Sequence, residues 1–197
     1  MAIERVENYD KLRPAFEDAV IANVKRGGAK STLGFLSEKT DFFEAPASMH
    51  HHLDKVGGLV LHSLNVWAVM KRLQTSYKGP IESFAIAALF HDLCKANFYV
   101  KEMKWRKPND RWVQQEEWGI KDQFPLGHGE KSVSILQDHM RVTEEEKLAI
   151  RWHMAWSDPG VHFYFGSNSW RDALNKCSLL KALVIADIEA TFFLDER

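Results

Sequence analysis

The sequence has few of the features that mark an exported or membrane-bound protein. It contains only two cysteines, Cys94 and Cys177, which lie far apart and outside any Cys-x-x-Cys pair, so we expect reduced thiols rather than a disulfide framework. The first residues, Met1 to Arg5, lack the charged and then apolar order of a signal peptide, and no apolar run approaches the roughly 20 residues of a membrane span. We therefore expect a cytoplasmic protein with no membrane partner.

The chain also lacks an excess of either charge. Its 26 Lys and Arg residues and 27 Asp and Glu residues give a formal net charge of −1, so any affinity for phosphate must come from a local arrangement. Internal repeats and low-complexity tracts are missing as well. A length of 197 residues, 45% of them hydrophobic, fits one domain. We predict a single domain, 1–197, with a helical N-terminal segment (1–47), a core (48–193) and an insertion at about 97–126.

Apolar residues at helical spacing predict an all-α protein. We expect helices at residues 10–26, from the 50–58 region to 77, and at 83–95, 127–139, 143–153 and 171–193. Residues 27–49 and 155–169 lack the pattern and are predicted to be loops, the first with a short apolar turn at 33–36.

The insertion differs in composition from the predicted helices. Aromatic and β-branched residues flank the turn sequence Pro108-Asn109-Asp110, which predicts a β-hairpin whose first half is basic. Such a hairpin is either a solvated element or a flap over an active site, and the sequence leaves both interpretations open.

One stretch places three ionisable groups at the end of an apolar run. Residues 83–90 are apolar enough for a buried helix, and His91, Asp92 and Lys95 follow directly. Burying each group costs several kcal/mol unless it finds a partner. In a helix His91 and Lys95 share a face. A metal ion would account for the His and the Asp, and an anionic ligand for the Lys.

Further His and Asp residues occupy comparable positions. His62 and Asp187 interrupt the apolar stripes of two predicted helices, and His128 and His153 lie at the ends of two others. A lone His on such a stripe is more often a core imidazole bonded to a carbonyl, whereas a carboxylate there needs a cationic partner. Helical bundles build metal sites from inward-projecting groups on facing helices, so the set as a whole favours a metal centre.

At these positions the chain resembles the HD-domain metal-dependent phosphohydrolases. The segments that carry the resemblance are Gly57-Gly58-Leu-Val-Leu-His62, Leu89-Phe-His91-Asp92-Leu-Cys-Lys95 and Ile185-Ala-Asp187. It covers roughly residues 48–190, and it implies an HD-domain helical bundle with the hairpin as an insertion. In the family, the residues that match His62, His91, Asp92 and Asp187 bind a metal ion.

The resemblance extends to members with two metal ions. His128 and His153 lie where such members carry two further His ligands, and the pattern is most similar to the HD domains of bacterial 3'-to-5' exoribonucleases. The chain lacks their nucleic-acid-binding OB-fold, and the hairpin is not part of the minimal pattern. The resemblance therefore implies two divalent ions bridged by Asp92.

The donor types indicate the chemistry. Imidazole and carboxylate donors without thiolate suit Mn, Fe, Co, Ni, Zn or Mg. Coordination lowers the pKa of water to about 7, so a metal-bound hydroxide would attack phosphorus. Asp92 and Lys95 are the predicted catalytic residues, and Lys95 would neutralise charge on a phosphoryl oxygen.

Four further residues are predicted to bind the substrate. Two lie beside the first predicted ligand helix and two on the first turn of the helix that follows the hairpin, where the helix dipole favours phosphate: His51, His52, Lys131 and Ser132. Cys94 is interpreted as a small packed residue, because the sequence offers it no partner for nucleophilic chemistry.

The sequence thus predicts a metal-dependent phosphohydrolase acting on a nucleotide or another small phosphoester. One alternative is a phosphodiesterase or exonuclease that acts on oligonucleotides or cyclic dinucleotides, with Trp residues of the hairpin stacking on bases. A second is a mixed-valent di-iron oxygenase, which uses the same ligand set on the same fold, and a third is a binding module without catalysis. The substrate, the metals and the oligomeric state stay open.

Overall fold

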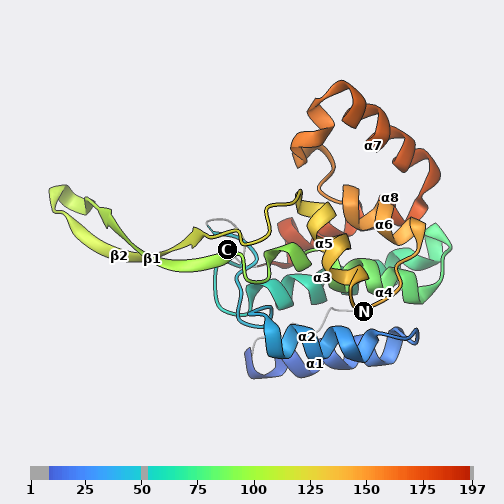
Figure 1. Ribbon diagram of the computed structural model, residues 1–197, viewed down its shortest axis with the longest axis horizontal. Helices are drawn as coiled ribbons and strands as arrows, with labels where there is room; N and C mark the ends of the chain where they lie inside the picture. Colours follow the sequence, from blue (N-terminus) through green and yellow to red (C-terminus); the bar gives the residue numbers. More distant parts are fainter. Residues whose placement is uncertain (1–8, 50–52, 196–197) are drawn as a thin grey trace.

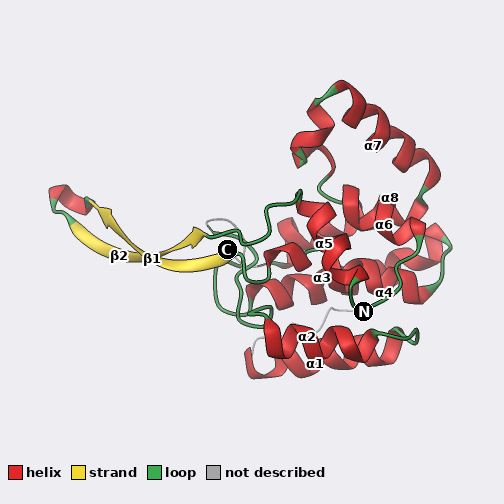
Figure 2. Ribbon diagram, in the orientation of Figure 1, coloured by secondary structure: helices red, strands yellow, loops and turns green. Residues whose placement is uncertain are grey.

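The computed structural model describes residues 9–49 and 53–195, which form a group of packed helices and one projecting β-hairpin (Figures 1 and 2). The α-helices in these residues are α1 (Tyr9–Asn23), α2 (Ala29–Lys39), α3 (Gly58–Tyr77), α4 (Ile81–Phe90), α5 (His128–Gln137), α6 (Glu144–Trp152), α7 (Tyr164–Lys176) and α8 (Ser178–Glu189). None of the helices in the described part of the chain is long and apolar enough to cross a membrane. The predicted all-α fold with a hairpin insertion is confirmed.

Helix α4 is the centre of the core. Every residue from Ser83 to Phe90 is buried, and the helix packs against α1, α3, α6 and α8. Burial of one large apolar side chain such as Phe90 contributes about 1.5–3 kcal/mol, so a helix that is buried from residue 83 to its end is held on every side. Its C-terminal end therefore places His91 and Asp92 at a fixed point inside the molecule.

The start of α3 depends on two glycines. Gly57 has a φ of 77°, in the left-handed region that favours glycine. A Cβ on Gly58 would lie 2.0 Å from the carbonyl oxygen of Leu53, so no side chain fits there. This tight entry places the first turn of α3, and hence His62, against α4 and α8.

Residues 29–39 form α2, so the loop predicted there is wrong. Its buried positions are Ala29, Thr32 and Leu36. They follow helical spacing, but one is polar and one is small, and the apolar face is therefore too weak to stand out in the sequence.

The predicted helix 171–193 is also wrong, because it is divided into α7 and α8. Cys177 between them has extended backbone angles, and its sulfur accepts a hydrogen bond from the Leu180 amide at 3.4 Å. Helix α7 begins at Tyr164, inside a predicted loop, with Ala173 on its buried side. A π-helical turn, Ala190–Leu194, follows α8.

The hairpin is formed by β1 (Tyr99–Arg106) and β2 (Val113–Ile120). The strands are antiparallel, with Tyr99 opposite Ile120 and Arg106 opposite Val113. They extend away from the helices, and the turn between them is the point farthest from the core (Figure 1). The hairpin is attached near its base, where the Trp118 indole donates a hydrogen bond of 2.9 Å to the Asp54 carbonyl.

Candidate metal centre

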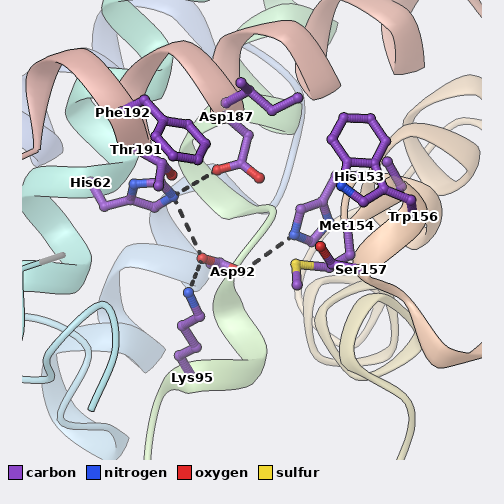
Figure 3. A pocket seen from close by; sticks show the side chains of 12 residues that line it. His62, Asp92, Lys95, His153, Met154, Trp156, Ser157, Asp187, Thr191 and Phe192 are labelled. Carbon is purple, nitrogen blue, oxygen red and sulfur yellow. Dashed lines mark ion pairs between the residues drawn. The ribbon is translucent and has the colours of Figure 1, made fainter. Parts of the chain in front are cut away.

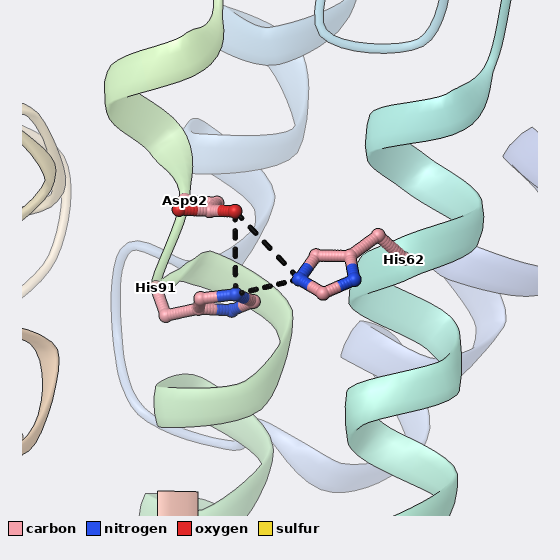
Figure 4. A group of neighbouring side chains, drawn as sticks. All are labelled: His62, His91 and Asp92. Carbon is pink, nitrogen blue, oxygen red and sulfur yellow. Dashed lines mark hydrogen bonds and ion pairs between the residues drawn. The ribbon is translucent and has the colours of Figure 1, made fainter. Parts of the chain in front are cut away.

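The structure brings the predicted metal ligands together from five helices. His62 lies in the second turn of α3, and His91 and Asp92 directly follow α4. His128 is the first residue of α5, His153 follows α6, and Asp187 lies in the last turn of α8. Figure 3 shows His62, Asp92, His153 and Asp187 around one pocket, and Figure 4 shows His62 and His91 facing Asp92.

Asp92 lies at the centre of this cluster, and its Oδ2 atom faces one half of it. This oxygen is 3.4 Å from His91 Nε2 and 3.7 Å from His62 Nε2. The Nε2 atoms of these two rings are 3.2 Å apart, and Asp187 Oδ1 lies 3.1 Å from His62 Nε2. One imidazole nitrogen from each of two rings and one oxygen from each of two carboxylates therefore converge on a small volume.

The Oδ1 atom of Asp92 faces the other half. His128 Nε2 is 2.7 Å away and His153 Nε2 is 3.4 Å away. The ring of His153 stands nearly perpendicular to that of His91, at 4.8 Å between centroids. Asp92 thus lies between two sets of imidazoles, one set at each of its carboxylate oxygens.

Backbone carbonyls fix the orientation of two of the imidazoles. His91 Nδ1 donates to the Ala88 carbonyl at 2.8 Å, and His153 Nδ1 donates to the Ile150 carbonyl at 2.7 Å. Because a carbonyl only accepts, Nδ1 carries the proton and Nε2 of the neutral ring presents a lone pair, the usual arrangement behind a metal ligand.

These nitrogens and oxygens fit a bound cation. His153 Nε2 is buried and has no hydrogen-bond partner among the described residues. Around His62, burial disfavours the imidazolium form, but hydrogen bonds with Asp187 and Asp195 outweigh this cost and raise the pKa of His62 to about 10. The surrounding acceptors therefore favour a positive charge at the point where a metal ion would bind.

Lys95 also belongs to the cluster. Its Nζ lies 2.7 Å from Asp92 Oδ2, and its side chain is 14% exposed. Burial opposes the charged forms of both groups, but Asp92 raises the pKa of Lys95, and the Lys95 ammonium holds the pKa of Asp92 well below its usual range. The ammonium and the carboxylate are both charged at the wall of the pocket.

The pocket beside the cluster has a volume of about 320 Å³. Its charged end is formed by His62, Asp92, Lys95, His153 and Asp187, and its other walls by residues 154–157, 188, 191 and 192. No residue of β1 or β2 lines it, so the structure gives no support to the interpretation of the hairpin as a flap.

The predicted substrate-binding residues do not reach this pocket in the described part of the chain. His51 and His52 lie outside the described residues. Lys131 Nζ is 2.5 Å from Asp122 Oδ1 and lies over the Phe98 ring. Ser132 Oγ accepts a hydrogen bond from the Cys94 amide at 3.0 Å. Their role in phosphate binding stays a prediction.

Sequence reasoning missed Asp195. Its Oδ2 is 2.8 Å from His62 Nδ1, its Oδ1 accepts from Asn65 Nδ2 at 2.8 Å, and its side chain is fully covered. A carboxylate behind a ligating imidazole orients the ring and raises its basicity. No local pattern signals this role, because the π-helical turn after α8 is what returns residue 195 to α3.

Asp195→Asn is expected to weaken the binding of divalent metal by about 10- to 100-fold, the usual effect of losing such a partner. The amide cannot accept as strongly from His62 Nδ1. Competitive titration with a metal-sensitive dye measures the change. Asp172→Asn, which alters an exposed carboxylate on α7, is the control and should bind metal as the parent protein does. Equal affinities in all three proteins would contradict the role of Asp195.

A model of the HD domain family matches residues 59–191, well over half of the chain. The chain therefore belongs to the HD-domain family, within a superfamily of metal-dependent hydrolases that bind divalent ions. The match contains all six predicted ligands. No curated protein and no solved structure matched the chain.

Within residues 9–49 and 53–195, two groups of side chains are close enough together to hold a metal ion. One is His62, His91 and Asp92, and the other is Asp92, Cys94 and His128. Asp92 is common to both. The participation of Cys94 was not predicted from the sequence.

Proposed function

We propose that this protein is a phosphohydrolase with a dinuclear metal centre that acts on a nucleotide or another small phosphoester. The observation that carries this proposal is the position of Asp92. Its Oδ2 faces His62 and His91, and its Oδ1 faces His128 and His153. Two-metal sites of hydrolases place their ions about 3.5–4 Å apart, and a carboxylate with donors at both oxygens suits the bridge between them.

The residues of the cluster would have distinct roles. Divalent ions at these donors supply Lewis acidity and lower the pKa of water toward neutrality. Lys95 holds a buried positive charge at the pocket wall, where it would neutralise charge that develops on a phosphoryl oxygen. Asp187 lies at Nε2 of His62 and Asp195 lies at its Nδ1. Together they would fix the orientation of the His62 ring, with Nε2 toward Asp92.

The shape of the pocket supports a small substrate with a planar group. A volume of about 320 Å³ is at the lower end of the range for small-molecule sites. Trp156 and Phe192 also line the pocket, with Phe192 beside His62 and Asp187 and Trp156 beside His153 (Figure 3). They are 59% and 67% exposed, so their rings offer stacking surface to a nucleobase while the phosphate lies at the charged end.

Trp156→Ala is expected to raise KM for a nucleoside monophosphate by about 5- to 100-fold, because stacking on one base contributes about 1–3 kcal/mol. The value of kcat should change by less than about twofold, since the ring does not touch the reacting phosphate. KM for a small alkyl phosphate should not change. Steady-state phosphate release measures both substrates.

Trp112→Ala is the matched control for this experiment. Trp112 is 64% exposed beside the hairpin turn and lies outside the pocket. It should leave both KM values unchanged. An equal rise of KM for the nucleotide and the alkyl phosphate in Trp156→Ala would contradict the stacking role.

A substrate panel tests the function itself. The protein loaded with Mn, Co or Zn is assayed for phosphate release from nucleotides and for shortening of 3'-labelled oligonucleotides. Release from nucleotides supports the proposal, and shortening alone would support the exonuclease alternative. Bound iron with a coupled Fe(II)/Fe(III) resonance signal and no phosphoester turnover would favour the di-iron oxygenase. Stable metal binding without any turnover would indicate a binding module.

Other expectations from the sequence stay predictions. They include the single HD-type domain with its boundaries at 47, 48 and 193, the cytoplasmic location and the closer likeness to the 3'-to-5' exoribonucleases. A nucleic acid partner is kept only as the alternative that the oligonucleotide assay tests.

A further inference from the structure

A thiol lies within the second half of the cluster. Cys94 Sγ is 3.3 Å from His128 Nδ1 and 3.4 Å from His128 Nε2, and the residue is only 4% exposed. His128 Nε2 in turn is 2.7 Å from Asp92 Oδ1. Sulfur, nitrogen and oxygen donors from three residues thus lie within 4.8 Å of one another.

We propose that Cys94 is a thiolate ligand of the second metal ion, the ion on the Oδ1 side of Asp92 with His128 and His153. This inference rests on the proposed dinuclear centre and adds a ligand that imidazole and carboxylate chemistry alone does not include. It makes the second site a mixed sulfur, nitrogen and oxygen site.

The separation of the two donors allows shared coordination once a side chain rotates. A zinc–sulfur bond of about 2.3 Å and a zinc–nitrogen bond of about 2.0–2.1 Å, at a tetrahedral angle, separate the two donors by about 3.6 Å. The observed separation of 3.4 Å between Cys94 Sγ and His128 Nε2 is close to that value. The sulfur is also 3.3 Å from Nδ1 of the same ring, so one of the two side chains must rotate for both donors to face one ion.

An independent observation on the same side of Asp92 also indicates a cation. His153 Nε2, with a side chain only 1% exposed, lies 3.4 Å from Asp92 Oδ1 and lacks a hydrogen-bond partner among the described residues. A buried acceptor without a donor is costly in a native protein. A metal ion shared with His128 and Cys94 would satisfy it.

Ser132 gives Cys94 and His128 a common support. Its Oγ accepts from the Cys94 amide at 3.0 Å and lies 3.4 Å from the His128 carbonyl, to which it donates. One buried hydroxyl therefore connects the backbones of both residues. Such fixed backbones hold ligands in place before the metal arrives, and this gives Ser132 a positioning role in the proposed site.

A thiolate changes which metals the site prefers. Soft sulfur ligands favour Zn and other late first-row ions, whereas Mg and Mn prefer oxygen donors. We expect the second site to bind Zn or Co in preference to Mg, while the site of His62, His91 and Asp187 has the harder donor set.

Cobalt spectroscopy on the full chain tests this inference. Under anaerobic, reducing conditions the parent protein should bind two Co(II) ions and show a near-ultraviolet charge-transfer band from the thiolate. Cys94→Ser should lose the band and bind the second Co(II) about tenfold more weakly or not at all. Cys177→Ser is the matched control, since Cys177 caps α8 away from the cluster, and it should keep the band and both ions.

A second measurement needs no variant. X-ray absorption at the zinc edge of the loaded parent protein should show a sulfur neighbour at about 2.3 Å. Two bound ions without a charge-transfer band and without sulfur scattering would overturn the inference and leave the dinuclear centre intact. Failure to bind any metal would overturn both. A band that persists in Cys94→Ser but disappears in Cys177→Ser would show that Cys177 supplies the thiolate, which would also contradict the proposal.

Discussion

Asp92→Asn is expected to lower kcat/KM by at least about 10³-fold, which corresponds to about 4 kcal/mol of transition-state stabilisation. The reason is that both halves of the cluster meet at its carboxylate, Oδ2 toward His62 and His91 and Oδ1 toward His128. An amide supplies one neutral oxygen and cannot bridge two cations. Metal analysis after dialysis should therefore also show the loss of at least one of the two ions.

Glu189→Gln is the matched control for this experiment. Glu189 is two residues from Asp187 on α8, but it pairs with Arg72 at the surface and does not line the pocket. It should retain activity and both ions. Asp92→Asn also removes the ion-pair partner of Lys95, which could destabilise the fold. Circular dichroism of the variant therefore separates a loss of chemistry from unfolding. A folded Asp92→Asn protein with full metal content and activity would contradict the bridging role.

Arg26→Met is expected to lower the free energy of unfolding by about 3–5 kcal/mol, the effect of removing one partner from a buried ion pair. The guanidinium makes two contacts with Glu146, at 2.7 and 2.8 Å, and the Glu146 side chain is fully buried. Ser83 also donates to this carboxylate, at 2.6 Å. Without Arg26, the charge of Glu146 lacks its guanidinium partner between α4 and α6. Urea denaturation measures the change.

Arg106→Met provides the contrast. Arg106 pairs with Glu117 on the exposed hairpin, at 2.5 Å. An exposed pair of this kind contributes little to stability, so the midpoint of unfolding should barely move. Equal losses of unfolding free energy in Arg26→Met and Arg106→Met would contradict this account of Arg26. They would show that the burial of Glu146 does not make its ion pair with Arg26 more important than an exposed pair.

The ligands could be predicted from the sequence because each one interrupts a pattern that is otherwise clear. His62 and Asp187 interrupt apolar helix faces, and His91 and Asp92 end the most apolar helix of the chain. The hairpin could be predicted because its turn sequence is specific. The fold class followed from these helices and from the family resemblance, and the structure confirms it.

The remaining features depend on contacts between distant segments. Cys94 looks like any small buried residue until α5 places His128 against it. Asp195 gains its role only because the chain turns back after α8. The first turn of α5 suggested phosphate binding, yet Lys131 faces Asp122 and Ser132 faces the Cys94 amide. The direction in which a helix presents a side chain follows from its packing, which the local sequence does not specify.

Helices α2 and α7 were missed for a related reason. Each has a small or partly polar buried face, Thr32 in the first and Ala173 in the second. Their helical structure is determined by the neighbours they pack against. A local apolar pattern is too faint to reveal it.

Anomalous diffraction from crystals of the Zn- or Mn-loaded protein is the most direct test of the central claim that one carboxylate joins two metal sites. We expect two peaks about 3.5–4 Å apart on either side of Asp92. One peak should lie among His62, His91 and Asp187, and the other near His128 and His153. A single peak remote from Asp92, or metal bound only at the protein surface, would contradict it.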